Sequence, residues 1–544
     1  MLCGILSFQK NQAKELIMRI VKILSIGVFV AVLLTGCNAG GNNFYAFNDK
    51  PETSNLYQAR KAVYRSDMPR SGNARVLVVP IEFSDYSAES LLRGAEGAHE
   101  DLRKVYFGEP EETQWESLKS YYEKSSYGKV TVSGQIMPWY RPLDHFTGEW
   151  LSTQELLDKY GTGNNDSGIA RTILGEIYSD YMIKLWQNVT DDEGNPYPNK
   201  EAFAQDYDGD GDGYIDVIQM VYSAPIQHLD SDLFWAFRSA DTSAAPLKTR
   251  PQVCGFVWLG YDFIYENGYF DELDVYHDWS DEQIASGEAK VDAHTIIHES
   301  GHAFGADDYY TYDNNDWGAL GGTDMMDYNV GDHNAFTKGI FGWADPVVVT
   351  GPTTIDLKSF TDTGEMIVLP AYRHDKKVNN SLLDNYLLIE YYRPIGLNAM
   401  DATYNYSGNY PKMPNVAGIR VYHVDARLGL FSYNSASGDW DFIRYVSNVS
   451  GTDSNSYIGI ANSNTKSFSS VAANKLIHAL EVSGLNTLKS AGAVYSSSMM
   501  WQEGDTFGYD TFVNFTLNNS EKLGYKFEIS DMSDESATIK FSRA

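Results

Sequence analysis

The sequence is poor in cysteine and in positive charge. Its 544 residues include three cysteines, and 42 Lys and Arg stand against 73 Asp and Glu, which gives a formal net charge of -31. Cys3 and Cys37 lie in or at the end of an N-terminal targeting segment, so Cys254 has no partner and an internal disulfide framework is excluded. We also expect no nucleic-acid partner, because that binding depends on Lys and Arg that neutralise phosphates.

Long apolar runs are scarce as well, and the one that stands out lies near the N-terminus. Residues 23–35 have the length of a signal-peptide core, which is too short to span a bilayer comfortably. The sequence LTGC ending at Cys37 resembles a bacterial lipobox, in which the cysteine is acylated. We therefore expect residues 1–37 to be a lipoprotein signal peptide, with residues 1–17 upstream of a better start at Met18.

Acylation of Cys37 would make the protein an extracytoplasmic lipoprotein, held at a bacterial membrane or cell surface by its lipid. An ordinary secretory signal and an uncleaved anchor are the alternatives.

The rest of the chain divides into three parts by composition. Residues 38–72 are polar and rich in Gly, Asn and Ser, which indicates a flexible linker or a short pro-segment. A nearly continuous apolar run at 74–85 predicts a buried strand that opens an α+β domain over 73–345. Residues 346–544 consist of short alternating or apolar runs, which predict a β-rich region of the β-sandwich type.

A metal-binding motif, HESGH, lies at residues 298–302. On a helix, His298 and His302 project from one face at a spacing that suits two zinc ligands, and Glu299 beside them is the candidate general base. Gly305 can take the left-handed conformation that ends the helix, so that Asp308 returns to the metal as the third ligand. The pattern HExxHxxGxxD predicts a catalytic zinc site.

Neighbouring residues leave some assignments open. Asp307 and Asp313 lie close to Asp308, and a capping or calcium-binding role could apply to any of the three. In GGTDMMDYN we expect Met326, in preference to Met325, to form a Met-turn beneath the metal.

Two further residues are candidates for stabilising an oxyanion: Tyr328 and His333. We expect His294, one turn before His298, to be a wall or helix-start residue, because histidines on three successive turns cannot converge on one tetrahedral ion. No G-x-S-x-G motif suggests a covalent acyl-enzyme.

Asp and Gly residues alternate at 206–216, near the middle of the predicted catalytic domain, and resemble the start of an EF-hand loop. In the register that begins at Asp208, position 12 is Gln219, where an EF-hand has a bidentate glutamate. A structural calcium site is the prediction, and a solvated acidic turn is the alternative. The candidate ligands are Asp206, Asp208, Asp210, Asp212 and Asp216.

Several blocks between residues 74 and 426 together resemble the immune inhibitor A type of secreted bacterial metallopeptidase, in the order of that family. The blocks are RVLVVPIEFSD, SLKSYYEKSSYGKVTVSG, DYDGDGDGYIDVIQMVYS, HESGHAFGADDYY, GGTDMMDYNVGDHNAFTKGIFGW and AGIRVYHVD. The chain departs from the expected pattern at Ala306 and Asp307, where a more apolar pair would precede the aspartate.

The resemblance implies a zincin catalytic domain with a metzincin-like metal site, followed by β-rich modules. It also implies zinc bound by His298, His302 and Asp308, catalysis by Glu299 and a Met-turn at Met326. The expected activity is that of a monomeric endopeptidase that hydrolyses extracellular proteins or peptides. A zinc hydrolase of another amide bond is one alternative, and a surface-binding lipoprotein or adhesin with a vestigial metal site is another.

Overall fold

The computed structural model describes residues 45–46, 66–144, 147–160, 173, 175, 177, 186–226, 234–240, 245–273, 275–312, 316–371, 382–404, 406, 410–436, 439–446, 456–464 and 474–544. The predicted signal peptide, Cys37 and most of the predicted linker lie outside these residues. Among the described helices, none is both long and apolar enough to cross a membrane.

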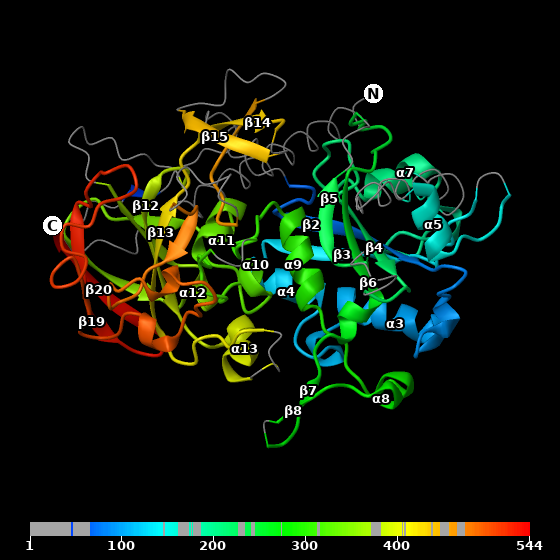
Figure 1. Ribbon diagram of the computed structural model, residues 1–544, viewed down its shortest axis with the longest axis horizontal. Helices are drawn as coiled ribbons and strands as arrows, with labels where there is room; N and C mark the ends of the chain where they lie inside the picture. The colour runs from blue at the N-terminus through cyan, green and yellow to red at the C-terminus, as the bar shows by residue number, and fades with distance from the viewer. Residues whose placement is uncertain are drawn as a thin grey trace, which may run out of the picture. The chain divides into compact units, whose positions relative to one another are not determined.

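A five-stranded sheet forms in the first half of the chain (Figure 1). The strands β3, β2, β4 and β6 run parallel to one another, and β5 is antiparallel to β6 at the edge. In spatial order the strands are β3 (Val130–Ile136), β2 (Gly72–Ile81), β4 (Val217–Tyr222), β6 (Gly255–Gly260) and β5 (Phe237–Ala240).

Both faces of this sheet are buried because successive side chains of a strand point to opposite faces. On β2, Val76 and Val78 belong to one core cluster, whereas Leu77 and Val79 belong to another. The first cluster includes residues of α3 (Gly94–Phe107), α4 (Leu118–Ser125) and α9 (His294–Ala303). The second includes residues of α5 (Thr153–Tyr160) and α7 (Lys200–Asp206).

Short elements connect the sheet to α9 and to the second half of the chain. They are η5 (Tyr261–Tyr265), the hairpin of β7 (Tyr269–Phe270) and β8 (Tyr276–His277), α8 (Asp281–Ser286), α10 (Met325–Tyr328) and α11 (Ala335–Phe341).

Three further sheets account for most of the second half. A six-stranded sheet has the order β1 (Tyr45–Ala46), β9 (Pro346–Val348), β11 (Met366–Pro370), β12 (Asn385–Tyr392), β13 (Gly418–Asp425) and β17 (Ile477–Ala479). A four-stranded sheet has the order β10 (Thr353–Lys358), β20 (Ser536–Arg543), β19 (Tyr525–Met532) and β18 (Thr506–Phe507). A three-stranded sheet consists of β15 (Asp439–Tyr445), β14 (Gly429–Asn434) and β16 (Ser456–Gly459).

The six-stranded and four-stranded sheets share one core. Ile389 of β12 and Val421 of β13 belong to the same buried cluster as Phe527 of β19 and Ile539 of β20. Two short helices, α12 (Phe360–Thr363) and α13 (Ala399–Thr403), accompany these sheets. The mixture of helices and sheets confirms the α+β class at this level of detail.

Candidate metal centre

The residues of the HESGH motif lie on α9, as predicted. Ile296 and Ile297 are buried in the core beside the five-stranded sheet, which fixes the rotation of the helix about its axis. The helix ends at Ala303, and Gly305 follows with φ of 98°, a left-handed conformation that glycine adopts without strain. The chain therefore reverses and returns to the helix.

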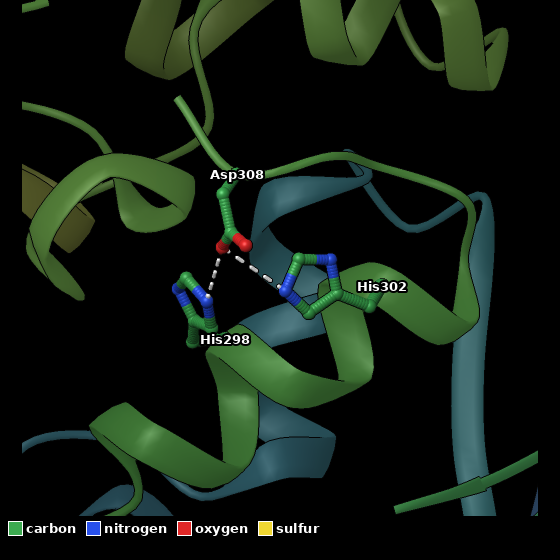
Figure 2. Close-up of side chains that lie close together, drawn as sticks. All are labelled: His298, His302 and Asp308. Atoms are coloured by element: carbon green, nitrogen blue, oxygen red, sulfur yellow. Dashed lines mark hydrogen bonds and ion pairs between the residues drawn. The ribbon is translucent and has the colours of Figure 1, made fainter. Parts of the chain in front are cut away.

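Two imidazole nitrogens and one carboxylate oxygen converge at this reversal (Figure 2). Asp308 Oδ1 lies 3.0 Å from His298 Nε2 and 3.1 Å from His302 Nε2. Two ligands of a tetrahedral zinc ion, each about 2.0–2.1 Å from the metal, lie roughly 3.3 Å apart. The three side chains are therefore spaced to hold a small metal ion.

Hydrogen bonds on the far side of each ring orient the two histidines. His298 Nδ1 lies 2.8 Å from the carbonyl oxygen of Met325, and His302 Nδ1 lies 2.7 Å from that of Ala306. A carbonyl oxygen only accepts, so both Nδ1 atoms donate, and in the neutral ring Nε2 carries the lone pair. This is the second-sphere arrangement that metal-binding histidines usually have.

The structure separates Asp308 from the two aspartates near it in the sequence. Asp308 is buried and belongs to the metal group, the side chain of Asp307 is exposed, and Asp313 lies outside the described residues. Burial opposes ionisation of Asp308, but the neighbouring His302 and His298 outweigh it and hold its pKa well below the usual range. Burial likewise opposes the charged form of His302, while Asp308 raises its pKa to about 10.

Glu299 lies beside the metal ligands and is buried, with 6% of its surface exposed. Burial raises the pKa of its carboxyl, while His298 and His302 act in the opposite direction. The backbone amide of Arg238 on β5 also hydrogen-bonds to it and lowers the pKa. Glu299 thus faces the edge strand of the five-stranded sheet, and a raised pKa suits a group that must accept and return a proton.

Met326 packs beneath the helix, where a Met-turn was predicted. It is fully buried, and a Cβ atom at Gly301 of α9 would lie 3.2 Å from its Cε. The adjacent Met325 supplies the carbonyl oxygen that holds His298.

Two tyrosines that the sequence analysis passed over lie at the metal group. The hydroxyl of Tyr312 donates to Asp308 Oδ2, the oxygen that does not face the histidines. The Tyr310 ring lies 6.3 Å from that of His298 and 5.4 Å from that of Tyr312. Their place directly after the third ligand, in DDYYTY, was the only sequence signal for them.

The two candidate oxyanion stabilisers differ in their surroundings. Tyr328 is 51% exposed, and its ring lies 6.3 Å from that of Tyr310. His333 is 1% exposed, and burial lowers the pKa of its ring well below the ordinary value. The His333 ring is enclosed by aromatic rings, so its position does not support contact with a substrate oxyanion; these rings belong to Tyr121, Tyr122, Phe341 and Trp343.

His294 is the first residue of α9 and lies outside the metal group, at the helix start. Its Nδ1 lies 2.8 Å from Asp292 Oδ2, its Nε2 lies 3.5 Å from Asp401 Oδ1, and its ring stacks on Trp115. Burial lowers the pKa of His294, but the two carboxylates outweigh it and raise the pKa to about 10. The ring therefore anchors the helix start.

The structure brings together only some of the predicted calcium ligands. Carboxylate oxygens of Asp208, Asp210 and Asp216 lie within 4.8 Å of one another. Asp206 instead pairs with Arg75, at 2.7 Å.

Asp212 and Asp216 both accept hydrogen bonds from backbone amides. The carboxylate of Asp212 accepts from the amide of Tyr214 at 2.9 Å, outside the group. Asp216 is buried, which raises the pKa of its carboxyl to about 8, and it accepts from the amides of Arg75 and Gly209.

No protein-family model matches the chain, and no curated protein matches it.

Proposed function

We propose that this chain is a zinc-dependent endopeptidase. One observation carries the proposal: His298 Nε2, His302 Nε2 and Asp308 Oδ1 converge next to Glu299, with both rings held through Nδ1. Two nitrogen ligands and one oxygen ligand suit zinc, and a set of three protein ligands leaves a fourth position for water or substrate, as catalytic zinc sites do.

The chain's own residues have distinct tasks in peptide hydrolysis. Zinc bound at this site would acidify water and polarise the peptide carbonyl. Glu299 accepts the proton of the attacking water at its carboxylate and then donates it to the leaving amine. Met326 and the carbonyl oxygens of Met325 and Ala306 keep the imidazole rings in place.

The surroundings of Glu299 support a peptide as the substrate. Arg238, whose backbone amide hydrogen-bonds to Glu299, belongs to β5, which is the edge strand of the five-stranded sheet. An edge strand offers backbone groups that pair with an extended peptide. A small amide substrate would not use such an edge.

The architecture supports the finer fold proposal. A twisted, mostly parallel sheet with an antiparallel edge strand beside the HExxH helix is consistent with a metzincin-like zincin domain. The core shared by the six-stranded and four-stranded sheets is consistent with a β-sandwich module. Secretion and lipid attachment at Cys37 rest on the sequence of residues 1–37 alone.

Casein cleavage and metal content test the function. We expect the purified full chain to cleave casein and to hold one zinc ion, and the Glu299→Gln variant to hold zinc but to lose at least about a thousandfold in rate, because it cannot accept a proton. Glu282→Gln, an exposed carboxylate on α8, is the matched control.

Each other outcome points elsewhere. Zinc without cleavage of casein or of any blocked peptide by the unmodified chain would favour another amide bond. Absence of bound zinc in both proteins would contradict the proposal and favour a binding lipoprotein.

A further inference from the structure

A second carboxylate lies along the face of α9 that carries the metal ligands. An α-helix turns about 100° per residue, so Thr295 projects at an angle between those of His298 and Glu299, about 5.4 Å closer to the helix start. The Thr295 hydroxyl donates to Glu266 Oε2 at 3.0 Å. Glu266, which directly follows η5, is therefore tied to the turn of α9 that precedes the candidate general base.

Polar side chains from two other segments complete the surroundings of Glu266. The Tyr410 hydroxyl donates to the same Oε2 at 3.1 Å, and the Asn329 amide donates to Thr295 Oγ1 at 3.4 Å. Asn329 directly follows α10, and the preceding residue, Tyr328, is 51% exposed. The group thus bridges α9 and α10, and Glu266 itself is half-buried.

The charge of Glu266 is poorly compensated. No described lysine or arginine forms an ion pair with it. Burial raises the pKa of its carboxyl and Asp292 raises it further, whereas the Thr295 and Tyr410 hydroxyls and the neighbouring His294 lower it. The neighbouring His294 carries one positive charge between the carboxylates of Asp292 and Asp401, so these three side chains together carry a net negative charge.

We propose that Glu266 binds a cationic side chain of the substrate, lysine or arginine, within two residues of the scissile bond. The inference rests on the proposed peptidase function. Two hydroxyls hold Oε2, and Oε1 can accept from an ammonium or guanidinium group. A substrate cation there would stabilise a partly buried carboxylate that forms no ion pair with any described lysine or arginine.

Cleavage-site mapping on a defined peptide library tests the proposal, with the sites read by mass spectrometry. For the full chain we expect Lys or Arg to be enriched at one position within two residues of the cut. On matched peptides that differ only by Lys or Met at that position, kcat/KM should favour Lys about tenfold.

The Glu266→Gln variant should lose this preference. Its amide oxygen can still accept from both hydroxyls, so we expect thermal unfolding to be unchanged and the ratio of kcat/KM for the Lys and Met peptides to fall to about one. Glu282→Gln, which changes an exposed carboxylate in the same way, should keep the preference.

The outcomes separate this inference from the function on which it rests. A full chain that cuts peptides without preferring Lys or Arg, or a Glu266→Gln variant that keeps the preference, overturns the role of Glu266 and leaves the peptidase intact. A full chain that cuts no peptide overturns the peptidase proposal and this inference together.

Discussion

Gly301 of α9 lies against Met326 of α10. A Cβ atom there would overlap the sulfur of Met326 and would lie 3.2 Å from Met326 Cε and 3.3 Å from the Tyr122 hydroxyl. Met326 is fully buried, so it has little room to move away. Gly301, which lies between the two histidines in the sequence, therefore sets how closely α9 packs on Met326.

Gly301→Ala should destabilise the protein by about 1–3 kcal/mol, the usual cost of overpacking a filled core. In the Met326→Ala background the same change should cost less, because the overlapping side chain is gone. Urea unfolding of the four proteins of this cycle measures the coupling. Equal costs in both backgrounds would show that the contact with Met326 does not matter.

At the residue scale, the motif predicted which side chains would meet but not everything that holds them. Histidines four residues apart share a helix face wherever the helix forms. Gly305 predicted the reversal of the chain that brings Asp308 back to the two histidines. The bond from Tyr312 to Asp308 depends on the path of an irregular segment, for which spacing gives no rule.

At the scale of elements, the acidic turn between α7 and β4 combines an unusual set of charges. Carboxylates of Asp208, Asp210 and Asp216 lie within 4.8 Å of one another, and Asp216 is buried. Like charges at this distance repel unless protons or a cation neutralise them. Asp216 also accepts from the amide of Arg75 on β2, so the turn is tied to the central sheet.

Calcium should therefore stabilise the protein. We expect the melting temperature of calcium-saturated protein to exceed that in EGTA by several degrees, and the difference to vanish in Asp210→Ala. Asp510→Asn, a distant exposed aspartate, is the control and should keep the full response. A melting temperature that is indifferent to calcium in the unmodified chain would favour the solvated acidic turn.

Strands were predicted more closely than their arrangement. The run 74–85 forms most of β2, because a continuous apolar run is stable inside a sheet covered on both faces. The antiparallel edge strand β5 was not predicted. Its residues, Phe237–Ala240, are half-buried and show no strong alternation.

At the scale of the whole molecule, the core crosses the boundary predicted at residue 345. One buried cluster extends from Met68 to Met500. Carboxylates of the second half also accept hydrogen bonds from the backbone that follows α10. Asp401 accepts from the amide of Gly331, and Glu390 accepts from the amide of Ala335 at 3.0 Å. The segment below the metal group therefore depends on contacts from the β-rich region.

A chain truncated after residue 345 should fail to unfold cooperatively in calorimetry, because it exposes much of this core. The full chain should show a transition that includes both halves. The control deletes the three-stranded sheet, residues 429–459, and joins its ends by a short linker, since Gly429 pairs with Gly459. A truncated chain that unfolds cooperatively would establish residues 73–345 as an independent domain.

Three buried histidines should make the fold sensitive to acid. Burial lowers the pKa of His423 to about 4 and the pKa values of His333 and His478 well below the ordinary value. Below pH about 6.5 the unfolded chain binds protons that the folded chain does not. Each histidine therefore lowers the free energy of unfolding by about 1.4 kcal/mol for every unit by which the pH falls. For His423 this loss ends near its folded pKa.

Urea unfolding between pH 7 and pH 5 tests this effect. His478→Leu should show a shallower pH dependence than the unmodified chain, by one histidine's share. Identical slopes for the two proteins would rule out the linkage at His478.

The sequence by itself determined the local features: the helix that carries His298, Glu299 and His302, the reversal at Gly305 and the strands with continuous apolar runs. These depend on residue periodicity and backbone conformation, which act over a few residues. Only the tertiary structure decided which aspartates of the acidic turn meet, that His333 is enclosed by aromatic rings, and that Glu266 lies beside Thr295. Those contacts join segments far apart in the chain, and their geometry follows from the packing of whole elements.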